Sequence, residues 1–251
     1  MFPIRDENPV LRTPIATIFI IILNVLVWAG LQGFGQPMTL LQSLCDWALI
    51  PGELFGKIPE GEAIPLGPNV ECVLENRSPW LTIFTSMFMH GSWFHLIANM
   101  WFLWIFGDNV EDAMGSERFI VFYLLCGLAA AAAQILGDPS STIPMVGASG
   151  AIGGVMGAYA RLYPNARVEN LVFMGYYVTT IALPAYVMLG YWFLIQIFSG
   201  MLTDTSAGGV AFWAHAGGFL AGIYLAGLMH RPDYLAEHLS QTPKRQAKHR
   251  W

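Results

Sequence analysis

Four polar side chains in otherwise apolar stretches are of the types that could carry out nucleophilic catalysis. Ser149 lies in VGASGAIGG, residues 146–154, among residues too small to surround its hydroxyl. His215 lies in a second stretch of small residues, and His95 and Asn99 are four apart, on one face if their stretch is helical. A histidine that takes a serine's proton makes it a nucleophile, and imidazole or amide N–H groups can stabilise an oxyanion. The four residues could therefore cleave an acyl bond.

The remaining polar groups of the apolar stretches narrow the chemistry. No Asp, Glu, Lys or Arg lies deep in them, which argues against a proton-driven pump. His90 and His95 are five residues apart with no Glu after either, so they lack the spacing of a zinc-protease helix. We expect no metal ion and no cofactor. Gln196, in a later apolar stretch, is interpreted as structural.

Each candidate also has an ordinary structural explanation. A serine among glycines in a membrane helix often serves packing or bonds back to its own helix. A histidine beside Trp213 is often structural or interfacial, and His95 with Asn99 could be an interhelical hydrogen-bonded pair. The residues taken singly leave both readings open.

The elements that must position these residues are membrane spans. Of the 251 residues, 55% are hydrophobic and only 12% charged, against roughly 25% charged in an average soluble domain. A helix needs about 20 apolar residues to cross ~30 Å of hydrocarbon. Six stretches predict an all-α membrane protein, a six-transmembrane helical bundle: Pro14–Leu31, Trp80–Phe106, Phe119–Leu136, Val146–Ala160, Leu171–Met201 and Gly208–Met229.

The distribution of Lys and Arg predicts the orientation of the bundle. If successive spans cross the membrane in opposite directions, ten of these residues lie on one side of the membrane and two, Lys57 and Arg77, lie on the other. Because cytoplasmic loops carry the excess of positive charge, both the N- and C-termini are predicted to be cytoplasmic. The chain then divides into a cytoplasmic tail (1–13), a six-helix domain (14–229) with an external loop (32–79), and a basic cytoplasmic tail (230–251). The first span is read as a retained anchor.

The cysteines fit this arrangement. Cys45 and Cys72 fall in the external loop, on the oxidising side if the cell is bacterial, and the sequence leaves open whether they form a disulfide. Cys126 lies within a span and is expected to be a small core residue. The expected location is the bacterial inner membrane, as a multi-pass protein.

The fourth span is too short to cross the membrane. From Gly147 to Ala160 it measures ~21 Å as a helix, so its N-terminus must begin inside the membrane. Irregular backbone at that depth requires protein or a water-filled cavity around it. Counted at ~1.5 Å per residue from the charged inner borders, Ser149, His215 and the His95–Asn99 pair share one slab in the centre and outer half of the bilayer. Ser149 is therefore expected in the first turn of a helix that opens into a wet pocket.

Small residues on two spans predict a close helix pair. Faces of this small-xxx-small kind let two backbones approach closely. Such an approach would bring Ser149 within hydrogen-bond reach of His215. The small residues are Gly150, Gly153, Gly154 and Gly157 on the fourth span and Ala214, Gly218 and Gly222 on the sixth.

Three motifs, in order, resemble the rhomboid intramembrane serine proteases. They are His90-x4-His95-x3-Asn99, Gly147-Ala148-Ser149-Gly150 and Ala214-His215-Ala216-Gly217-Gly218-x3-Gly222. The resemblance extends over essentially the whole six-span chain, including Gly107–Glu111 and Gly115. It implies that Ser149 is the nucleophile and His215 the general base, a dyad without an acid. It also implies an oxyanion hole of His95, Asn99 and the Ser149 N–H, with His90 as a supporting polar residue and Gly147, Gly150, Gly218 and Gly222 as supporting glycines.

The sequence departs from the family pattern at two places. Many members carry an aromatic residue four positions after the serine, packed on the catalytic histidine, but here that position is Gly153. The contact that orients His215 is therefore expected from elsewhere, with Tyr159 and Trp213 as candidates. A Trp-Arg pair often found in the first loop is also missing, which leaves the fold of that loop in doubt.

The expected function is hydrolysis of peptide bonds in or near the transmembrane segments of other membrane proteins. The expected partners are single-span substrates and the lipid bilayer, with no nucleic acid and no metal. A soluble hydrolase elbow is excluded because G-x-S-x-G would need glycine at Ala151. The alternatives are a noncatalytic membrane binding protein of the same fold and a small-solute channel. The presence of Ser149 and His215 and the lack of a continuous polar lining favour the protease.

Overall fold

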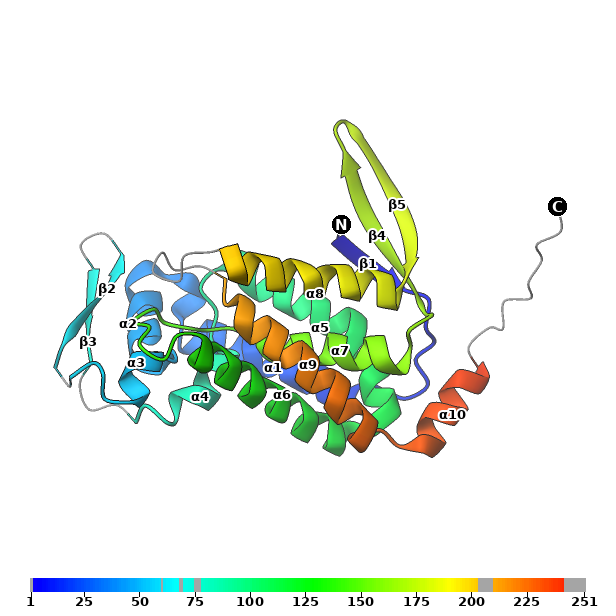
Figure 1. The fold of residues 1–251 in the computed structure, drawn as a ribbon, viewed down its shortest axis with the longest axis horizontal. Helices are drawn as coiled ribbons and strands as arrows, with labels where there is room; N and C mark the ends of the chain where they lie inside the picture. The colour runs from blue at the N-terminus through cyan, green and yellow to red at the C-terminus, as the bar shows by residue number, and fades with distance from the viewer. Residues whose placement is uncertain (1, 60, 68–69, 75–77, 203–209, 242–251) are drawn as a thin grey trace.

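The computed structural model describes residues 2–59, 61–67, 70–74, 78–202 and 210–241. Its centre is a helical bundle whose helices run along one common direction (Figure 1). Among the described helices, α6, α8 and α9 are long and apolar enough to cross a membrane, and α1 is a shorter apolar helix. α7 lies in the middle of the bundle and is buried along nearly its whole length. The helices of this bundle are α1 (Ile15–Gly30), α5 (Trp93–Met114), α6 (Ser116–Gly137), α7 (Ser149–Leu162), α8 (Ala185–Leu202) and α9 (Phe212–Met229).

The second predicted span is wrong at its beginning. Instead of one helix from Trp80, the chain forms the short helix α4 (Thr82–Thr85), the 3-10 turn η2 (Ser86–Phe88) and then extended backbone. Ser92 accepts a hydrogen bond from the His95 backbone N–H at 3.1 Å and caps α5. Since serine is a strong N-cap, α5 begins only at Trp93, and His90 lies outside the helix.

The fifth predicted span is helical only in its second half, so the protein is mostly helical instead of all-α. Its first half forms two antiparallel strands, β4 (Arg167–Met174) and β5 (Tyr177–Pro184), before α8 begins at Ala185. Gly175 takes a φ of +61° at the turn between them, a conformation that favours glycine. The N-terminal strand β1 (Phe2–Asp6) pairs with β4, giving a sheet of order β1-β4-β5. From Leu171 to Pro184 the two strands contain no charged residue, so hydropathy does not separate this part from the helix that follows.

The predicted external loop is a folded cap at the opposite end of the bundle from this sheet (Figure 1). Cys45 and Cys72 form a disulfide with their Cα atoms 5.6 Å apart, which settles the question that the sequence left open. Cys72 packs with Ile50, Ile58 and Ile64 in a small apolar core of its own. The cap contains η1 (Gly33–Gly35), α2 (Pro37–Trp47), α3 (Pro51–Leu54), β2 (Ala63–Gly67) and β3 (Val70–Val73).

A buried carboxylate holds the start of α1. Glu111 of α5 accepts hydrogen bonds from the backbone N–H groups of Ala16 and Thr17 at 2.9 and 2.8 Å, and from the Thr17 hydroxyl at 2.8 Å. These N–H groups belong to the first turn of α1, where helices lack internal acceptors, and a negative charge there is favourable. A side chain from another helix thus supplies the N-terminal cap of α1.

The C-terminal tail is partly helical. α10 (Pro232–Gln241) lies against the end of α5, and the Tyr234 ring stacks between the guanidinium groups of Arg12 and Arg231, each 3.9 Å from its centre. Residues 242–251 of the predicted basic tail, and the start of the sixth predicted span at residues 208 and 209, lie outside the described residues. The part of the tail that is described is therefore packed against the bundle.

Candidate active site

Ser149 and His215 are brought together by two helices in backbone contact. Ser149 is the first residue of α7, and its Oγ lies 2.8 Å from Nε2 of His215, in the first turn of α9. A Cβ atom at Gly222 would overlap the Gly154 carbonyl oxygen, and one at Gly218 would lie 2.9 Å from the Gly150 carbonyl carbon. Only glycine allows so close an approach, as the small-residue faces predicted.

Gln196 holds the other side of the His215 ring. Its Oε1 lies 2.8 Å from His215 Nδ1, and its Nε2 donates to the Trp192 carbonyl oxygen at 3.4 Å. Because the amide nitrogen faces a carbonyl, the amide oxygen must face the ring and accept its proton. Nδ1 then carries the hydrogen and Nε2 is free to accept the Ser149 proton. The interpretation of Gln196 as merely structural missed this contact with His215.

The aromatic neighbour of His215 is Trp192, whose ring centre lies 5.7 Å from that of the histidine. Neither candidate named from the sequence has this role. The Tyr159 hydroxyl bonds to Asp6, and its ring packs edge-on against Phe106. Trp213 stands beside Gly137 and Gly200. A Cβ at Gly153 would lie 3.0 Å from the His215 carbonyl oxygen, so an aromatic residue there would require the two helices to shift by a few tenths of an ångström.

His95 and Asn99 face the serine from α5. The Gly91 N–H donates to His95 Nδ1 at 3.4 Å, so the neutral ring carries its hydrogen on Nε2. A Cβ atom at Gly147 would lie 2.8 Å from this Nε2 and 3.4 Å from Ser149 Oγ, which places both atoms around one point. Asn99 is 6% exposed, and within the described part of the chain its Nδ2 has no hydrogen-bond partner. Two donors thus point to the same side of Ser149.

Glycines shape the chain around the nucleophile. Gly147 has a φ of +129°, which few other residues adopt, and its N–H donates to the Ser86 carbonyl oxygen at 2.9 Å. A Cβ at Gly150 would lie 2.6 Å from that of Ala130 on α6. α7 has no side-chain cap, so the N–H groups of its first turn remain available to a ligand.

His90 packs against His95. It is fully buried, and its ring packs edge-on against that of His95, 5.1 Å between centres. Its backbone N–H and C=O pair with the side-chain amide of Gln32, at 2.8 and 2.7 Å. His90 therefore links the start of α5 to the chain that follows α1.

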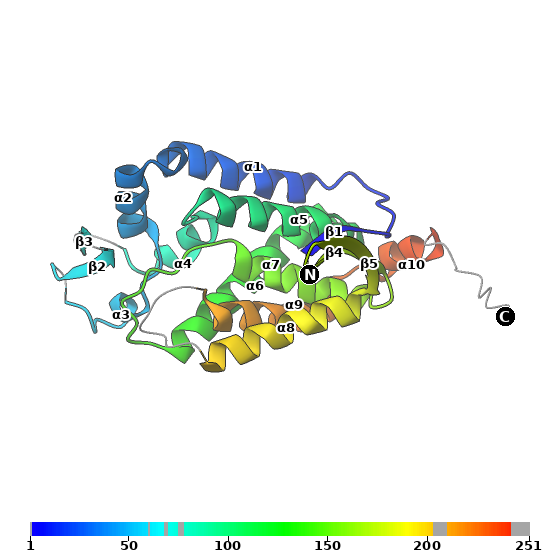
Figure 2. The ribbon, with the colours of Figure 1, turned by 90° about the horizontal axis from the view of Figure 1, so that it is seen from above.

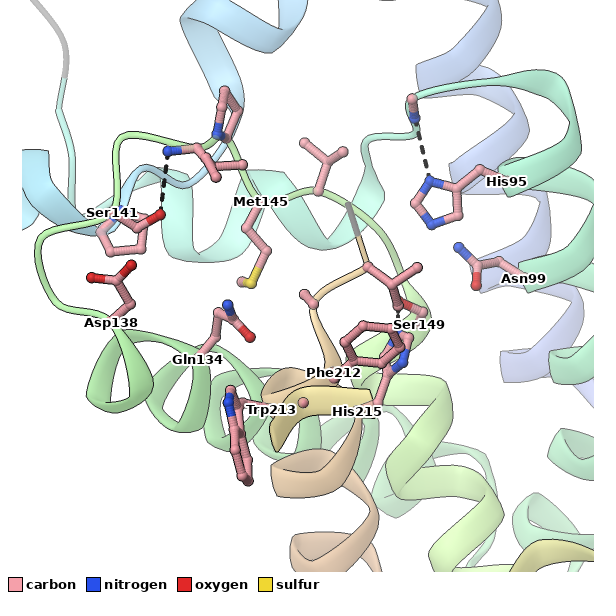
Figure 3. A pocket seen from close by; sticks show the side chains of 18 of the residues that line it. His95, Asn99, Gln134, Asp138, Ser141, Met145, Ser149, Phe212, Trp213 and His215 are labelled. Carbon is pink, nitrogen blue, oxygen red and sulfur yellow. Dashed lines mark hydrogen bonds between the residues drawn. The ribbon is translucent and has the colours of Figure 1, made fainter. Parts of the chain in front are cut away.

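A cavity of about 580 Å³ joins these groups, and it is lined by Ser149, His215, His95 and Asn99. Figure 3 shows Ser149 beside His215, with His95 and Asn99 opposite on α5 and Gln134, Asp138 and Ser141 farther along the wall. The cavity also touches Gly200 and Trp213 at the ends of α8 and α9. The predicted pocket at the N-terminus of α7 is thus present.

Comparison with known protein families matches residues 77–232 to the Rhomboid domain. Over 181 residues the chain is 32% identical to RHOMBOID-like protein 5 of Arabidopsis thaliana, which covers 69% of this chain and 53% of that protein. It is 32% identical over 97 residues to Rhomboid protein 1, mitochondrial, of Saccharomyces cerevisiae, or 37% of this chain and 28% of that one.

A bacterial relative is similar over a comparable region. Over 156 residues the chain is 31% identical to Rhomboid protease GluP of Bacillus subtilis, 62% of this chain and 27% of that protein. The chain thus spans between 27% and 53% of the length of these three relatives.

Proposed function

The chain belongs to the rhomboid family, and on that premise we propose that it is an intramembrane serine endopeptidase. It would cleave peptide bonds in or near the transmembrane segments of single-span membrane proteins. The observation that carries the proposal is the 2.8 Å contact between Ser149 Oγ and His215 Nε2 at the wall of a cavity within an apolar bundle. The protease name of the Bacillus subtilis relative agrees with it.

The reaction follows the usual course of acyl transfer. Nε2 of His215 takes the Ser149 proton as Oγ attacks the carbonyl carbon of the substrate. The C–N bond then breaks, and His215 returns the proton to the leaving amine. A water molecule, deprotonated by the same histidine, then attacks the acyl carbonyl carbon. The bond between this carbon and Oγ breaks, and His215 returns the proton to Ser149 Oγ. Gln196 accepts from Nδ1 throughout, and it takes the orienting place that an aspartate has in soluble serine proteases.

We propose the membrane topology expected from the charges, with six spans and both termini cytoplasmic. The Cys45–Cys72 disulfide in the cap supports this side assignment, because disulfides persist in oxidising compartments. Residence in a bacterial inner membrane stays a prediction, since relatives come from a plant and from mitochondria as well as from a bacterium.

The proposal is tested by cleavage in a bilayer. The purified protein, reconstituted in vesicles with a panel of single-span model substrates, should release fragments cut in or beside the span. The Ser149→Ala variant in the same vesicles controls for contaminating proteases. Intact substrates across the whole panel would instead favour the noncatalytic relative of the same fold.

The proposed oxyanion hole of His95 and Asn99 leads to a kinetic prediction. We expect His95→Ala and Asn99→Ala each to lower kcat by ~10² or more and to change KM little, because these donors act mainly on the charge of the transition state. Steady-state kinetics on a cleaved substrate measures this. A rise in KM at unchanged kcat would assign both residues to substrate binding instead.

Gln196 makes a second kinetic prediction, as a positioning residue. Replacing it with leucine removes the acceptor for His215 Nδ1–H and should lower kcat ~10-fold or more, a part of the ~10²–10⁴ that a positioned base contributes. Gln196→Glu keeps an oxygen in place and should restore most of the rate. Equal losses in the two variants would show that Gln196 only fills space.

A further inference from the structure

The strand pair β4–β5, here called the hairpin, is unusually poor in charge. From Asn170 through Leu202, most of the hairpin and all of α8, the sequence contains no Asp, Glu, Lys, Arg or His. Antiparallel strands that face water carry polar residues on the wet face, and exposed edges are commonly protected by charges. The composition of the hairpin is therefore that of a segment shielded from bulk water.

Within the part of the chain that the structure describes, nothing covers the outer half of the hairpin. Tyr176 at the turn is fully exposed, and Phe173, Tyr177 and Val178 are 65%, 79% and 58% exposed. The charged residues are confined to the base, where Arg5 and Glu169 pair at 2.8 Å. The hairpin thus has a charged base and an aromatic tip.

The hairpin extends across the bundle instead of along it. In Figure 1 it rises steeply from the end of the bundle where α7 ends and α8 begins. In the same view its tip lies above α8. Figure 2, turned by 90°, shows it nearly end-on beside α8. Two strands of eight residues reach about 26 Å. If the helices cross the membrane, the hairpin lies close to the membrane plane.

The sheet lies at the level of the membrane boundary. On β1, the Pro3 carbonyl accepts from the Trp101 indole N–H at 2.8 Å, and Phe2 stacks on the Trp101 ring. Trp101 precedes Asp108, the first carboxylate of α5, by about 10 Å of helix. The sheet therefore meets the bundle within about 10 Å of the first charges, near the membrane boundary where tyrosine and tryptophan are enriched.

We propose that the hairpin is a lipid-binding element that lies in the interfacial layer of the bilayer, with its aromatic tip among the headgroups and upper acyl chains. The hydrocarbon core itself is excluded, because β5 is an edge strand whose outward N–H and C=O groups need partners. The interface supplies water and headgroup oxygens for them. Lipid is favoured as the occupant because the hairpin continues directly into α8, a membrane-crossing candidate.

A single fluorophore at the tip tests the placement. Cys45 and Cys72 are joined and Cys126 is buried, so Tyr176→Cys offers one reactive thiol for a bimane label. Tyr176 is fully exposed, so the fold should tolerate the change. Glu62→Cys, next to strand β2 of the cap, is the matched control position, which is exposed to water. Both proteins are placed in vesicles of phosphatidylcholine and phosphatidylglycerol.

The label at the tip should show blue-shifted emission and should be quenched by lipids that carry a nitroxide near the headgroup. Iodide in the aqueous phase should quench it little. The control label should show the opposite result in all three measurements. Equal iodide quenching at both positions would overturn the proposal. Strongest quenching by a nitroxide at the methyl end of the chain would overturn the interfacial depth. A disulfide between the tips of two copies would assign the surface to self-association. None of these readings depends on proteolysis.

Discussion

Fluorophosphonate labelling should be all or none at Ser149. The wild-type protein in detergent should be labelled, because His215 Nε2 accepts the Ser149 proton across 2.8 Å and the cavity leaves the hydroxyl reachable. Labelling should be lost in Ser149→Ala, which removes the nucleophile. It should fall to the background in His215→Ala, because an unactivated hydroxyl reacts slowly. In-gel fluorescence and mass spectrometry of the labelled peptide measure both.

The matched control is Ser141→Ala, in the wall of the same cavity. The Ser141 hydroxyl accepts from the Ile143 N–H at 3.3 Å, and no histidine of the described residues is hydrogen-bonded to it, so this variant should keep full labelling. Labelling that survives Ser149→Ala, or that maps to Ser141, would contradict the assignment of the nucleophile.

Gly222→Ala should inactivate the protein without touching any polar residue of the site. The new Cβ would overlap the Gly154 carbonyl oxygen and lie 2.5 Å from its carbon, and both are backbone atoms that cannot move aside alone. α7 and α9 would have to separate by roughly 1 Å, and misplacement on that scale costs ~10² in rate. Overpacking of this kind also destabilises by about 1–3 kcal/mol or more. Cleavage rate and thermal unfolding in detergent measure the two effects.

The comparison variant is Gly190→Ala, within α8. A Cβ there meets nothing within 4 Å, so alanine should leave rate and stability near those of the wild type, or raise stability slightly through its better helix propensity. A Gly222→Ala protein as active and as stable as Gly190→Ala would mean that the backbone contact between the helices is not needed.

The contact of Ser149 with His215 could be predicted from the sequence because both conditions for this contact are local. Glycines at helical spacing specify a close helix pair, and a span too short to cross the membrane specifies that the serine begins a helix inside it. The depth of each residue follows from counting along a helix. These properties need no knowledge of the rest of the fold.

The errors arose where hydropathy does not encode secondary structure. Residues 171–184 are apolar on both faces, so no alternation marked them as strands, and only Gly175 signalled a turn. Ser92 is a residue type that favours a helix start, but the apolar residues before it made the predicted span begin earlier than α5 does. The role of Gln196 could not be foreseen, because which side of α8 faces His215 depends on how three helices pack.

The pairing of β1 with β4 constrains the order in which the chain is completed during synthesis. Phe2 pairs with Leu171 and Asp6 with Val168. β1 therefore cannot pair until residues more than 160 positions later in the chain have been synthesised. At ~5–20 residues per second, that delay is about ten seconds or more. β4 and β5, joined by a short turn, can pair soon after they emerge and present an edge to the waiting strand. The N-terminal strand can therefore enter this sheet only after α7 and β4 have been made.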